Sequence, residues 1–249
     1  VSLGGILTIL SFVFLPTDKF EKDSSNSTFD YLGAVSFVVA IFAFNISFNL
    51  AAMDGWQKPY CYILLIVGVF SLVSLIYVQM KNEHPLIPKS LFNFTALKIL
   101  SSLACGFSAF GIWMYYVWVF MVPLKGNAPL LATAEFCPLS ITSVSALVLT
   151  TYLFLKEMKS NLIMLIGLTC MLISLILLAT AKEDTSYWGY LFVSTLIAPF
   201  GVVLVSTTAV SVLSDMVDSN QQGVSSALII SASSISFGLG ISGLSLIHI

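Results

Sequence analysis

Residues 161–181 read NLIMLIGLTCMLISLILLATA, a run without a single charged side chain. A helix rises about 1.5 Å per residue, so about 20 apolar residues cross the roughly 30 Å hydrocarbon core of a bilayer. Residues 1–15 resemble the end of a further run of this kind. Six more complete runs are found outward along the chain, at about 31–52, 60–79, 97–121, 134–155, 188–213 and 224–247.

These runs are too long and too continuous for the strands of a membrane barrel, whose residues alternate between lipid and lumen. A helix satisfies its own backbone hydrogen bonds in hydrocarbon, so each run is predicted to be helical. The predicted fold class is all-α, a polytopic membrane helical bundle with seven complete spans and one partial span.

The overall composition supports this environment and excludes several others. Hydrophobic residues make up 58% of the chain and charged residues 9%, whereas soluble domains carry about 25% charged residues. The net charge is -2 and all ten basic residues are lysine, which disfavours nucleic-acid binding. The four cysteines and two histidines lack the short spacings of metal sites, and no nucleophile and base occur together. We therefore expect neither an enzyme nor a cofactor.

The lysines predict the orientation of the bundle, because cytoplasmic loops collect basic residues. Seven of the ten lysines lie in or beside one set of connecting segments, and three lie in the other set. The lysine-rich set, predicted to be cytoplasmic, comprises segments 16–30, 80–96, 156–160 and 214–223. The set predicted to lie outside comprises segments 53–59, 122–133 and 182–187.

Polar residues inside or beside spans are candidates for a permeation path, because burying them in lipid is costly. Asn45 and Asn49 are four residues apart and share one helix face, which suits either a permeation path or an amide clamp between helices. Glu135 lies at the predicted outer end of span 134–155. It is either a helix N-terminal acid stabilised by the dipole or a proton-coupling group in a cavity.

Aromatic residues are concentrated in the outer half of span 97–121. Trp113, Tyr116 and Phe120 follow helical spacing along one stripe, while Tyr115 and Trp118 lie on another. Such a stripe is typical of an interfacial aromatic belt or of the wall of a cavity for an organic solute. The sequence leaves both interpretations open.

Two other spans carry small residues or helix-loosening residues. Ala232, Ser236 and Gly240 recur every four positions, which predicts a face where another helix approaches closely. Pro199 and Gly201 are expected to loosen the helix of span 188–213, and Thr207 adds a hydroxyl beyond them.

Five segments, read in order, resemble a known family. They are FDYLG (29–33), GWQKPY (55–60), HPLIP (84–88), FGIWMYY (110–116) and QGVSS (222–226). Together they resemble the fungal fourteen-span drug:proton antiporters of the major facilitator superfamily, within the branch of aminotriazole-resistance proteins and boron exporters. No single motif is strong, but their order and spacing are specific.

The resemblance implies a division of the chain into four parts. Residues 1–15 would end a span of a preceding N-terminal bundle, and 16–30 would form a cytoplasmic linker. Residues 31–96 would hold an inserted pair of spans and a cytoplasmic loop, and 97–249 a truncated C-terminal bundle. Alternating access requires two bundles, so this stretch alone is not expected to transport.

The resemblance also implies the function and the site. It implies a multi-pass protein of the plasma membrane rather than the vacuolar membrane, acting as a monomer in the lipid bilayer and exporting small toxic solutes or drugs in exchange for protons. The alternatives are an inactive truncated fragment or a non-transporting membrane protein such as a seven-span receptor. The implied cavity is lined by spans 97–121, 134–155, 188–213 and 224–247. The candidate residues on the solute and proton pathway are Asn45, Asn49, Trp113, Tyr116, Glu135, Thr207 and Ser233.

Overall fold

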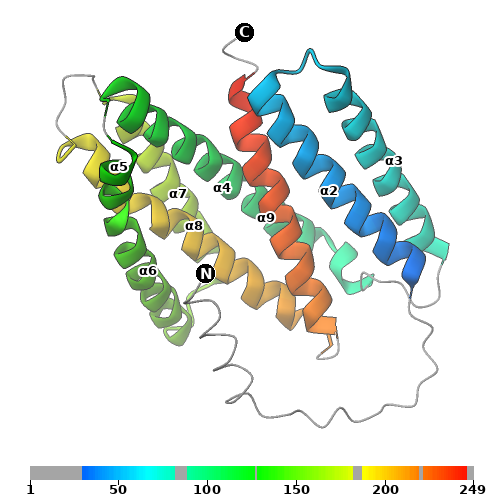
Figure 1. Ribbon diagram of the computed structural model, residues 1–249. Coiled ribbons are helices and arrows are strands. Elements are labelled where there is room, and N and C mark those ends of the chain that lie inside the picture. The colour runs from blue at the N-terminus through cyan, green and yellow to red at the C-terminus, as the bar shows by residue number, and fades with distance from the viewer. Residues whose placement is uncertain (1–29, 82–88, 127, 182–186, 219–220, 246–249) are drawn as a thin grey trace, which may run out of the picture.

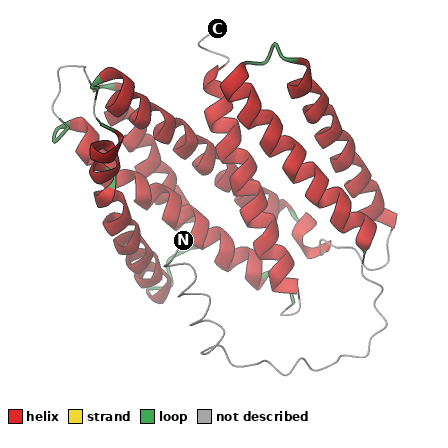
Figure 2. Ribbon diagram, viewed as in Figure 1, coloured by secondary structure: helices red, strands yellow, loops and turns green. Residues whose placement is uncertain are grey.

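The computed structural model describes residues 30–81, 89–126, 128–181, 187–218 and 221–245. Over these segments the chain consists of helices and the loops that join them, as Figure 2 shows. The predicted partial span at 1–15, nearly all of the predicted linker at 16–30 and the end of the chain at 246–249 lie outside the described residues.

Seven helical segments of the described chain are long and apolar enough to cross a membrane, which confirms the predicted fold class (Figure 1). The protein is therefore an integral, multi-pass membrane protein. The spans are α2 (Tyr31–Asp54), α3 (Pro59–Lys81), α4 (Phe94–Val119) with the π-helical turn η2 (Phe120–Leu124), α5 (Pro129–Glu135) with α6 (Cys137–Leu155), α7 (Ser160–Ala179), α8 (Tyr190–Asp215) and α9 (Gln222–Ser245). A short 3-10 turn, η1 (Lys89–Phe92), precedes α4.

The predicted spans agree with the observed helices to within a few residues, except at one place. The helix predicted to begin at residue 134 begins at Pro129 and is interrupted at Phe136, so that α5 and α6 share one span. Pro138 in the first turn of α6 suits a helix start, because proline has no N–H to satisfy there. At the other end of the chain, the Asp30 side chain caps α2 by accepting a hydrogen bond from the Gly33 N–H at 2.9 Å, as an N-cap residue does.

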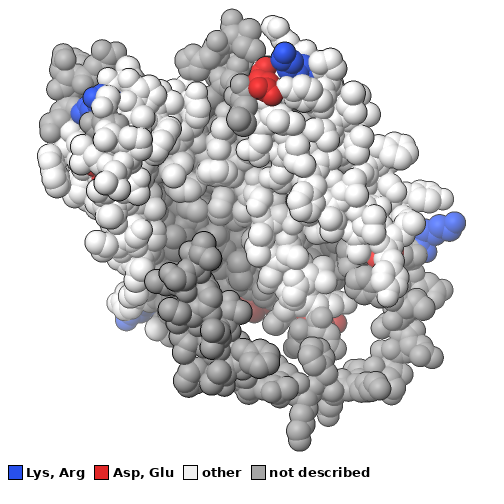
Figure 3. All heavy atoms as spheres, in the orientation of Figure 1, with Lys and Arg blue, Asp and Glu red and all other residues white. Residues whose placement is uncertain are grey.

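Charged side chains lie towards the ends of the helices. Figure 3 shows the middle of the visible face almost entirely uncharged, with lysine and acidic atoms at its margins. Consecutive spans alternate in direction, so the ends of α3, α6 and α8 lie on the same side as the starts of α2, α4, α7 and α9 (Figure 1). The helix ends that flank the connections between α3 and α4, α6 and α7, and α8 and α9 therefore lie on one side, in agreement with the grouping of the connecting segments by their lysines.

Helix α8 is the central element of the bundle, because it packs against α4, α6, α7 and α9. Its contact with α7 depends on two glycines. A Cβ at Gly201 would lie 2.9 Å from the Met171 Cβ, and one at Gly167 would lie 3.0 Å from the Gly201 carbonyl oxygen. Although Pro199 was expected to loosen this span, α8 continues through it as one helix, buried against its neighbours.

Helices α4 and α9 cross at the predicted small-residue face. A Cβ at Gly240 would overlap the backbone carbonyl of Ser108, and a Cβ at Gly111 would lie 2.5 Å from the Phe237 carbonyl oxygen. The Ser108 hydroxyl donates to the Ser236 carbonyl oxygen at 2.9 Å. Close approach of backbones across small residues is the usual basis of helix association in lipid. The prediction from Ser236 and Gly240 is confirmed.

A buried polar cluster joins α4, α7 and α8. The Trp113 indole N–H donates to the Ser194 hydroxyl at 2.7 Å, and the Ser174 hydroxyl lies 2.9 Å from the same oxygen. All three side chains are fully buried. Leaving one buried donor unpaired costs about 1–3 kcal/mol, so this cluster fixes how the three helices meet.

Candidate functional site

The candidate site is a pocket of about 570 Å³ at the meeting of α2, α4, α8 and α9. Its volume lies within the range of small-molecule sites, roughly 300–1,000 Å³. The pocket is lined by Asn45 of α2, Phe107 and Phe110 of α4, Ser206 and Val210 of α8, and Ile229, Ile230, Ser233, Ser234 and Phe237 of α9.

The walls of this pocket are mainly aromatic and aliphatic, with a few polar groups. Phe110 and Phe237 lie with their ring centroids 5.9 Å apart, and Phe110 stacks on Trp113 at 5.7 Å. Aromatic faces contact the planar or apolar part of an organic solute, while a few hydrogen-bonding groups orient it. The lining therefore suits an organic molecule with a small polar portion.

Three of the four polar side chains of the pocket donate to their own helices. The Asn45 amide N–H donates to the Ile41 carbonyl oxygen at 3.0 Å, the Ser206 hydroxyl to that of Val203 at 3.2 Å, and the Ser233 hydroxyl to that of Ile229 at 2.8 Å. The hydroxyl hydrogens of Ser206 and Ser233 are thus engaged, and their oxygens are available to accept. Asn45 keeps a second amide hydrogen, and the exposed Ser234 hydroxyl has no described bond, so the pocket can both donate to a solute and accept from it.

Among the predicted site residues, the structure brings Asn45 and Ser233 together in this pocket. Asn49 is exposed, and its amide donates to the Asn45 carbonyl oxygen at 2.7 Å. Both asparagines therefore donate within α2 and not across to a neighbouring helix. The described bonds do not form the interhelical amide clamp that the sequence left open.

Three other predicted residues lie outside the lining. Trp113 is fully buried and stacks on Phe110, so it supports the pocket wall from behind. Tyr116 is half-buried beside Tyr115, and the half-buried Thr207 hydroxyl donates to the Val203 carbonyl oxygen at 2.6 Å. Neither is part of the pocket lining.

The two predicted aromatic stripes of α4 are observed. Trp113 and Phe120 are buried and Tyr116 is half-buried, whereas Tyr115 is 38% exposed and Trp118 is 43% exposed. The first stripe therefore faces the bundle, which the sequence alone left open.

Glu135 ends α5 at the interruption before α6, on the side predicted to lie outside. Glu135 is half-buried, and its backbone carbonyl accepts a hydrogen bond from the Tyr187 hydroxyl at 2.5 Å. The adjacent Phe136 ring meets Trp113 edge-on at 6.5 Å. Glu135 is therefore not in the pocket, but the rings of Phe136, Trp113 and Phe110 form a continuous packed path from its helix end to the pocket wall.

The phenol of Tyr187 has a perturbed acidity. Burial, together with the nearby Glu135 carboxylate and the Cys137 thiol, raises the pKa of Tyr187 above its usual value of 10.0. The neutral phenol is therefore favoured in the folded protein, and it keeps its hydrogen bond to the Glu135 carbonyl under ordinary conditions.

Tyr187→Phe is expected to lower the free energy of unfolding by about 0.5–1.5 kcal/mol near pH 8, because it removes one partly buried hydrogen bond. Above pH 10 the unfolded tyrosine ionises before the folded one, so the wild-type protein loses this contribution and the difference between the proteins shrinks. The unfolding midpoints of both proteins at pH 8 and above pH 10 test this expectation. Tyr190→Phe, at an exposed position of α8, is the control, and a difference independent of pH would contradict the argument.

The sequence singled out Asn45 and Ser233 but missed most of the lining, above all Phe107, Phe110 and Phe237. It also assigned the cavity partly to span 134–155, whereas the described pocket is lined by α2 in addition to α4, α8 and α9. Phe237 directly follows Ser236 of the small-residue face, but neighbours in sequence do not share a helix face, so this placement was no signal for the pocket.

Known proteins similar to this chain are fungal membrane transporters. An MFS-type transporter of Schizosaccharomyces pombe, itself described as uncharacterised, is 36% identical over 240 residues, covering 96% of this chain and 46% of the relative. A low affinity ammonium transporter of Saccharomyces cerevisiae is 35% identical over 245 residues, covering 96% of this chain and 47% of the relative. An efflux pump of Aspergillus terreus is 34% identical over 239 residues, covering 95% of this chain and 46% of the relative.

The branch within these transporters is not resolved by similarity. The aminotriazole resistance protein of Saccharomyces cerevisiae is 22% identical over 230 residues, well below the three relatives above. No protein-family model matches the chain. The chain spans about half the length of the curated relatives that it matches.

Proposed function

We propose that this chain forms part of a transporter of the major facilitator superfamily that moves small organic solutes across a membrane. The observation that carries the proposal is the pocket itself, which joins helices from four spans and combines aromatic walls with a few hydrogen-bonding groups. Similarity to transporters and efflux pumps over nearly the whole chain supports it. The same similarity favours transport over the alternative of a seven-span receptor.

The finer proposal is export of toxic solutes or drugs in exchange for protons, by a monomer in the plasma membrane. Relatives described as an efflux pump and as a multidrug transporter support the direction and the solute class. Glu135 is the proposed proton-coupling group, since protonation there could alter the α5–α6 junction. The packed rings of Phe136 and Trp113 connect this junction to the pocket wall.

Ammonium is the second candidate solute, because one relative is a low affinity ammonium transporter. The pocket chemistry favours the organic solute. A volume of about 570 Å³ and three phenylalanine rings exceed what a small inorganic cation requires. Hydroxyl and amide oxygens would also accept from ammonium, so a direct comparison of solutes is needed.

The experiment uses the full-length protein in liposomes with radiolabelled aminotriazole and radiolabelled methylammonium as probes. We expect aminotriazole uptake to increase several-fold when the lumen is acidic. Glu135→Gln is expected to abolish this stimulation. The rate of uptake measured without a pH gradient should be unchanged in this variant. Glu157→Gln is the matched control, because Glu157 is exposed on the opposite side of the bundle.

Each alternative has a distinct result. If the wild-type protein takes up aminotriazole at the same rate with and without a pH gradient, proton coupling is wrong and transport is facilitated diffusion. If methylammonium is transported and aminotriazole is not, the proposed solute is ammonium and not an organic molecule. Absence of transport for every probe would contradict the proposed function.

A further inference from the structure

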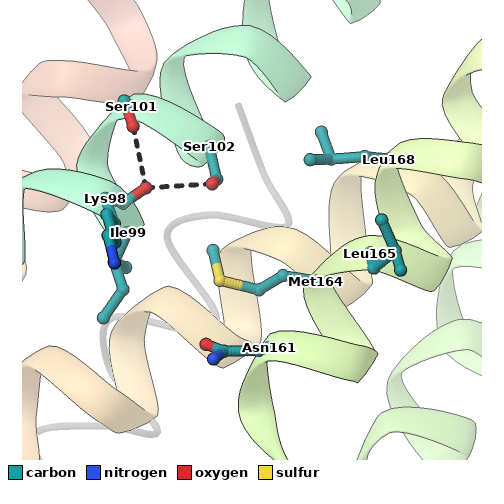
Figure 4. Close-up of a pocket in the computed structure, with 8 residues that line it drawn as sticks. All are labelled: Lys98, Ile99, Ser101, Ser102, Asn161, Met164, Leu165 and Leu168. Atoms are coloured by element: carbon teal, nitrogen blue, oxygen red, sulfur yellow. Dashed lines mark hydrogen bonds between the residues drawn. The ribbon is translucent and has the colours of Figure 1, made fainter. Parts of the chain in front are cut away.

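A second cleft, of about 300 Å³, lies between the N-terminal parts of α4 and of α7 (Figure 4). It is separate from the pocket that contains Asn45 and Ser233, with which it shares no lining residue. Its lining combines four polar side chains with four apolar ones. The residues are Lys98, Ile99, Ser101 and Ser102 of α4, and Asn161, Met164, Leu165 and Leu168 of α7.

Two hydrogen-bond donors of this cleft are uncommitted within the described residues. The Lys98 ammonium lies 4.5 Å from the centre of the Phe94 ring and forms no ion pair there, and the Asn161 amide has no described partner. A cation over an aromatic ring is held in place while remaining available to an anion. The pair can therefore bind a phosphate group, with the lysine supplying the charge and the amide a directed donor.

The two serines of the cleft offer acceptors instead. The Ser101 and Ser102 hydroxyls both donate to the Lys98 carbonyl oxygen at 2.9 Å, as the dashed lines in Figure 4 show. Their oxygen lone pairs are thus left to accept from O–H or N–H groups. Because the serines lie three and four residues deeper in α4 than Lys98, the phosphate specificity of the cleft rests on Lys98 and Asn161.

The position of the cleft relative to the membrane follows from the helix ends. Asn161 lies in the first turn of α7, whereas Leu168 lies seven residues further along, about 10 Å deeper at 1.5 Å per residue. Leu165, between them, is 57% exposed. Ser101 likewise lies seven residues beyond Phe94, the first residue of α4, so the two serines are about as deep as Leu168. Only Lys98 and Asn161 are therefore near the level of lipid headgroups, and the rest of the cleft leads into the hydrocarbon.

We propose that this cleft binds an anionic phospholipid such as phosphatidylinositol. The phosphate contacts Lys98 and Asn161, and an acyl chain passes Ser101 and Ser102 along the exposed surface of Leu165. The cleft volume accommodates the headgroup, while the chains remain in the bilayer. The lysine distribution predicts that this side is cytoplasmic, where anionic lipids are concentrated.

The test measures lipid binding to the full-length protein in detergent, independently of transport. Native mass spectrometry with added phosphatidylinositol or phosphatidylcholine gives the bound fraction, and the unfolding midpoint gives the stabilisation. We expect preferential binding of phosphatidylinositol and a higher midpoint with this lipid. Lys98→Gln is expected to weaken its binding about five-fold, the effect of one basic contact at a membrane surface.

Lys156→Gln is the matched control, because Lys156 is also exposed on this side of the bundle and also lies over a ring, that of Tyr152, at 5.7 Å. It lines no described pocket and should leave binding unchanged. An equal loss in both variants would overturn the site in favour of general charge attraction. If phosphatidylcholine binds as well as phosphatidylinositol, the proposed preference for an anionic headgroup is wrong. If glycerophosphoinositol or inorganic phosphate raises the midpoint as much as phosphatidylinositol does, the ligand is not a lipid.

Discussion

Gly240→Ala is expected to lower the unfolding midpoint of the full-length protein by several degrees, even though alanine is the better helix former. The new methyl group would overlap the Ser108 backbone carbonyl, and a backbone atom cannot move aside as a flexible side chain can. Forcing α4 and α9 apart would also lengthen the hydrogen bond from the Ser108 hydroxyl to the Ser236 carbonyl. Overpacking of this kind costs about 1–3 kcal/mol.

Gly243→Ala separates the packing effect from helix propensity. Gly243 belongs to the same helix, and a Cβ there would meet no atom within 4 Å. It should leave the midpoint unchanged or raise it, because alanine replaces glycine in a helix with a gain of up to about 1 kcal/mol. Midpoints measured in one detergent at one heating rate test both variants. If the two variants have the same unfolding midpoint, helices α4 and α9 do not cross as closely at Gly240 as described.

Enlarging residue 233 is expected to stop transport without unfolding the protein. Ser233 lines the pocket and is half-buried, so a cysteine of similar size should fold and transport normally. Attaching a benzyl group to that cysteine with a thiosulfonate reagent would fill much of the space beside Phe237. We expect the initial rate of aminotriazole uptake to fall at least ten-fold after modification.

The matched control is Ser231→Cys, which lies on the same helix but outside the pocket lining. Its modification should leave uptake unchanged. The background must lack the natural cysteines, because Cys105 and Cys137 are exposed. Equal inhibition at both positions would mean that the reagent acts by distorting α9 and not by filling the pocket.

The span positions were predictable because lipid imposes a simple length requirement. About 20 apolar residues in a helix cross the bilayer, so α2, α3 and α7 could be located by counting. The close crossing at Gly240 was predictable too, because residues four apart on a helix share a face. In both cases one local rule determines the answer.

The faces that line the pocket were not predictable by the same means. Phe107 and Phe110 lie on a helix whose outward surface is also apolar, since lipid tails are as apolar as the protein interior. Hydrophobic periodicity therefore does not separate inward residues from lipid-facing ones. Only the packing of α2 and α9 against α4 identifies which phenylalanines reach the cavity.

The interruption between α5 and α6 was missed for a related reason. Residues 129–155 remain apolar across Phe136, so the hydropathy signal is continuous where the backbone is not. Pro138 was the available local signal, because proline favours the first turn of a new helix. Glu135 was expected in the first turn of a helix, where the dipole stabilises an acid, but it is the last residue of α5. Its link to Tyr187 depends on a loop contact that no pattern within one helix reveals.

The most direct test of the central claim is solute protection at position 233. The rate of thiol modification of Ser233→Cys in the full-length protein is measured with and without saturating aminotriazole, in the background that lacks the natural cysteines. The account predicts that the solute slows modification at least several-fold at 233 and leaves the rate at Ser231→Cys unchanged. A transported solute that leaves the rate at 233 unchanged would contradict the assignment of this pocket to the solute pathway.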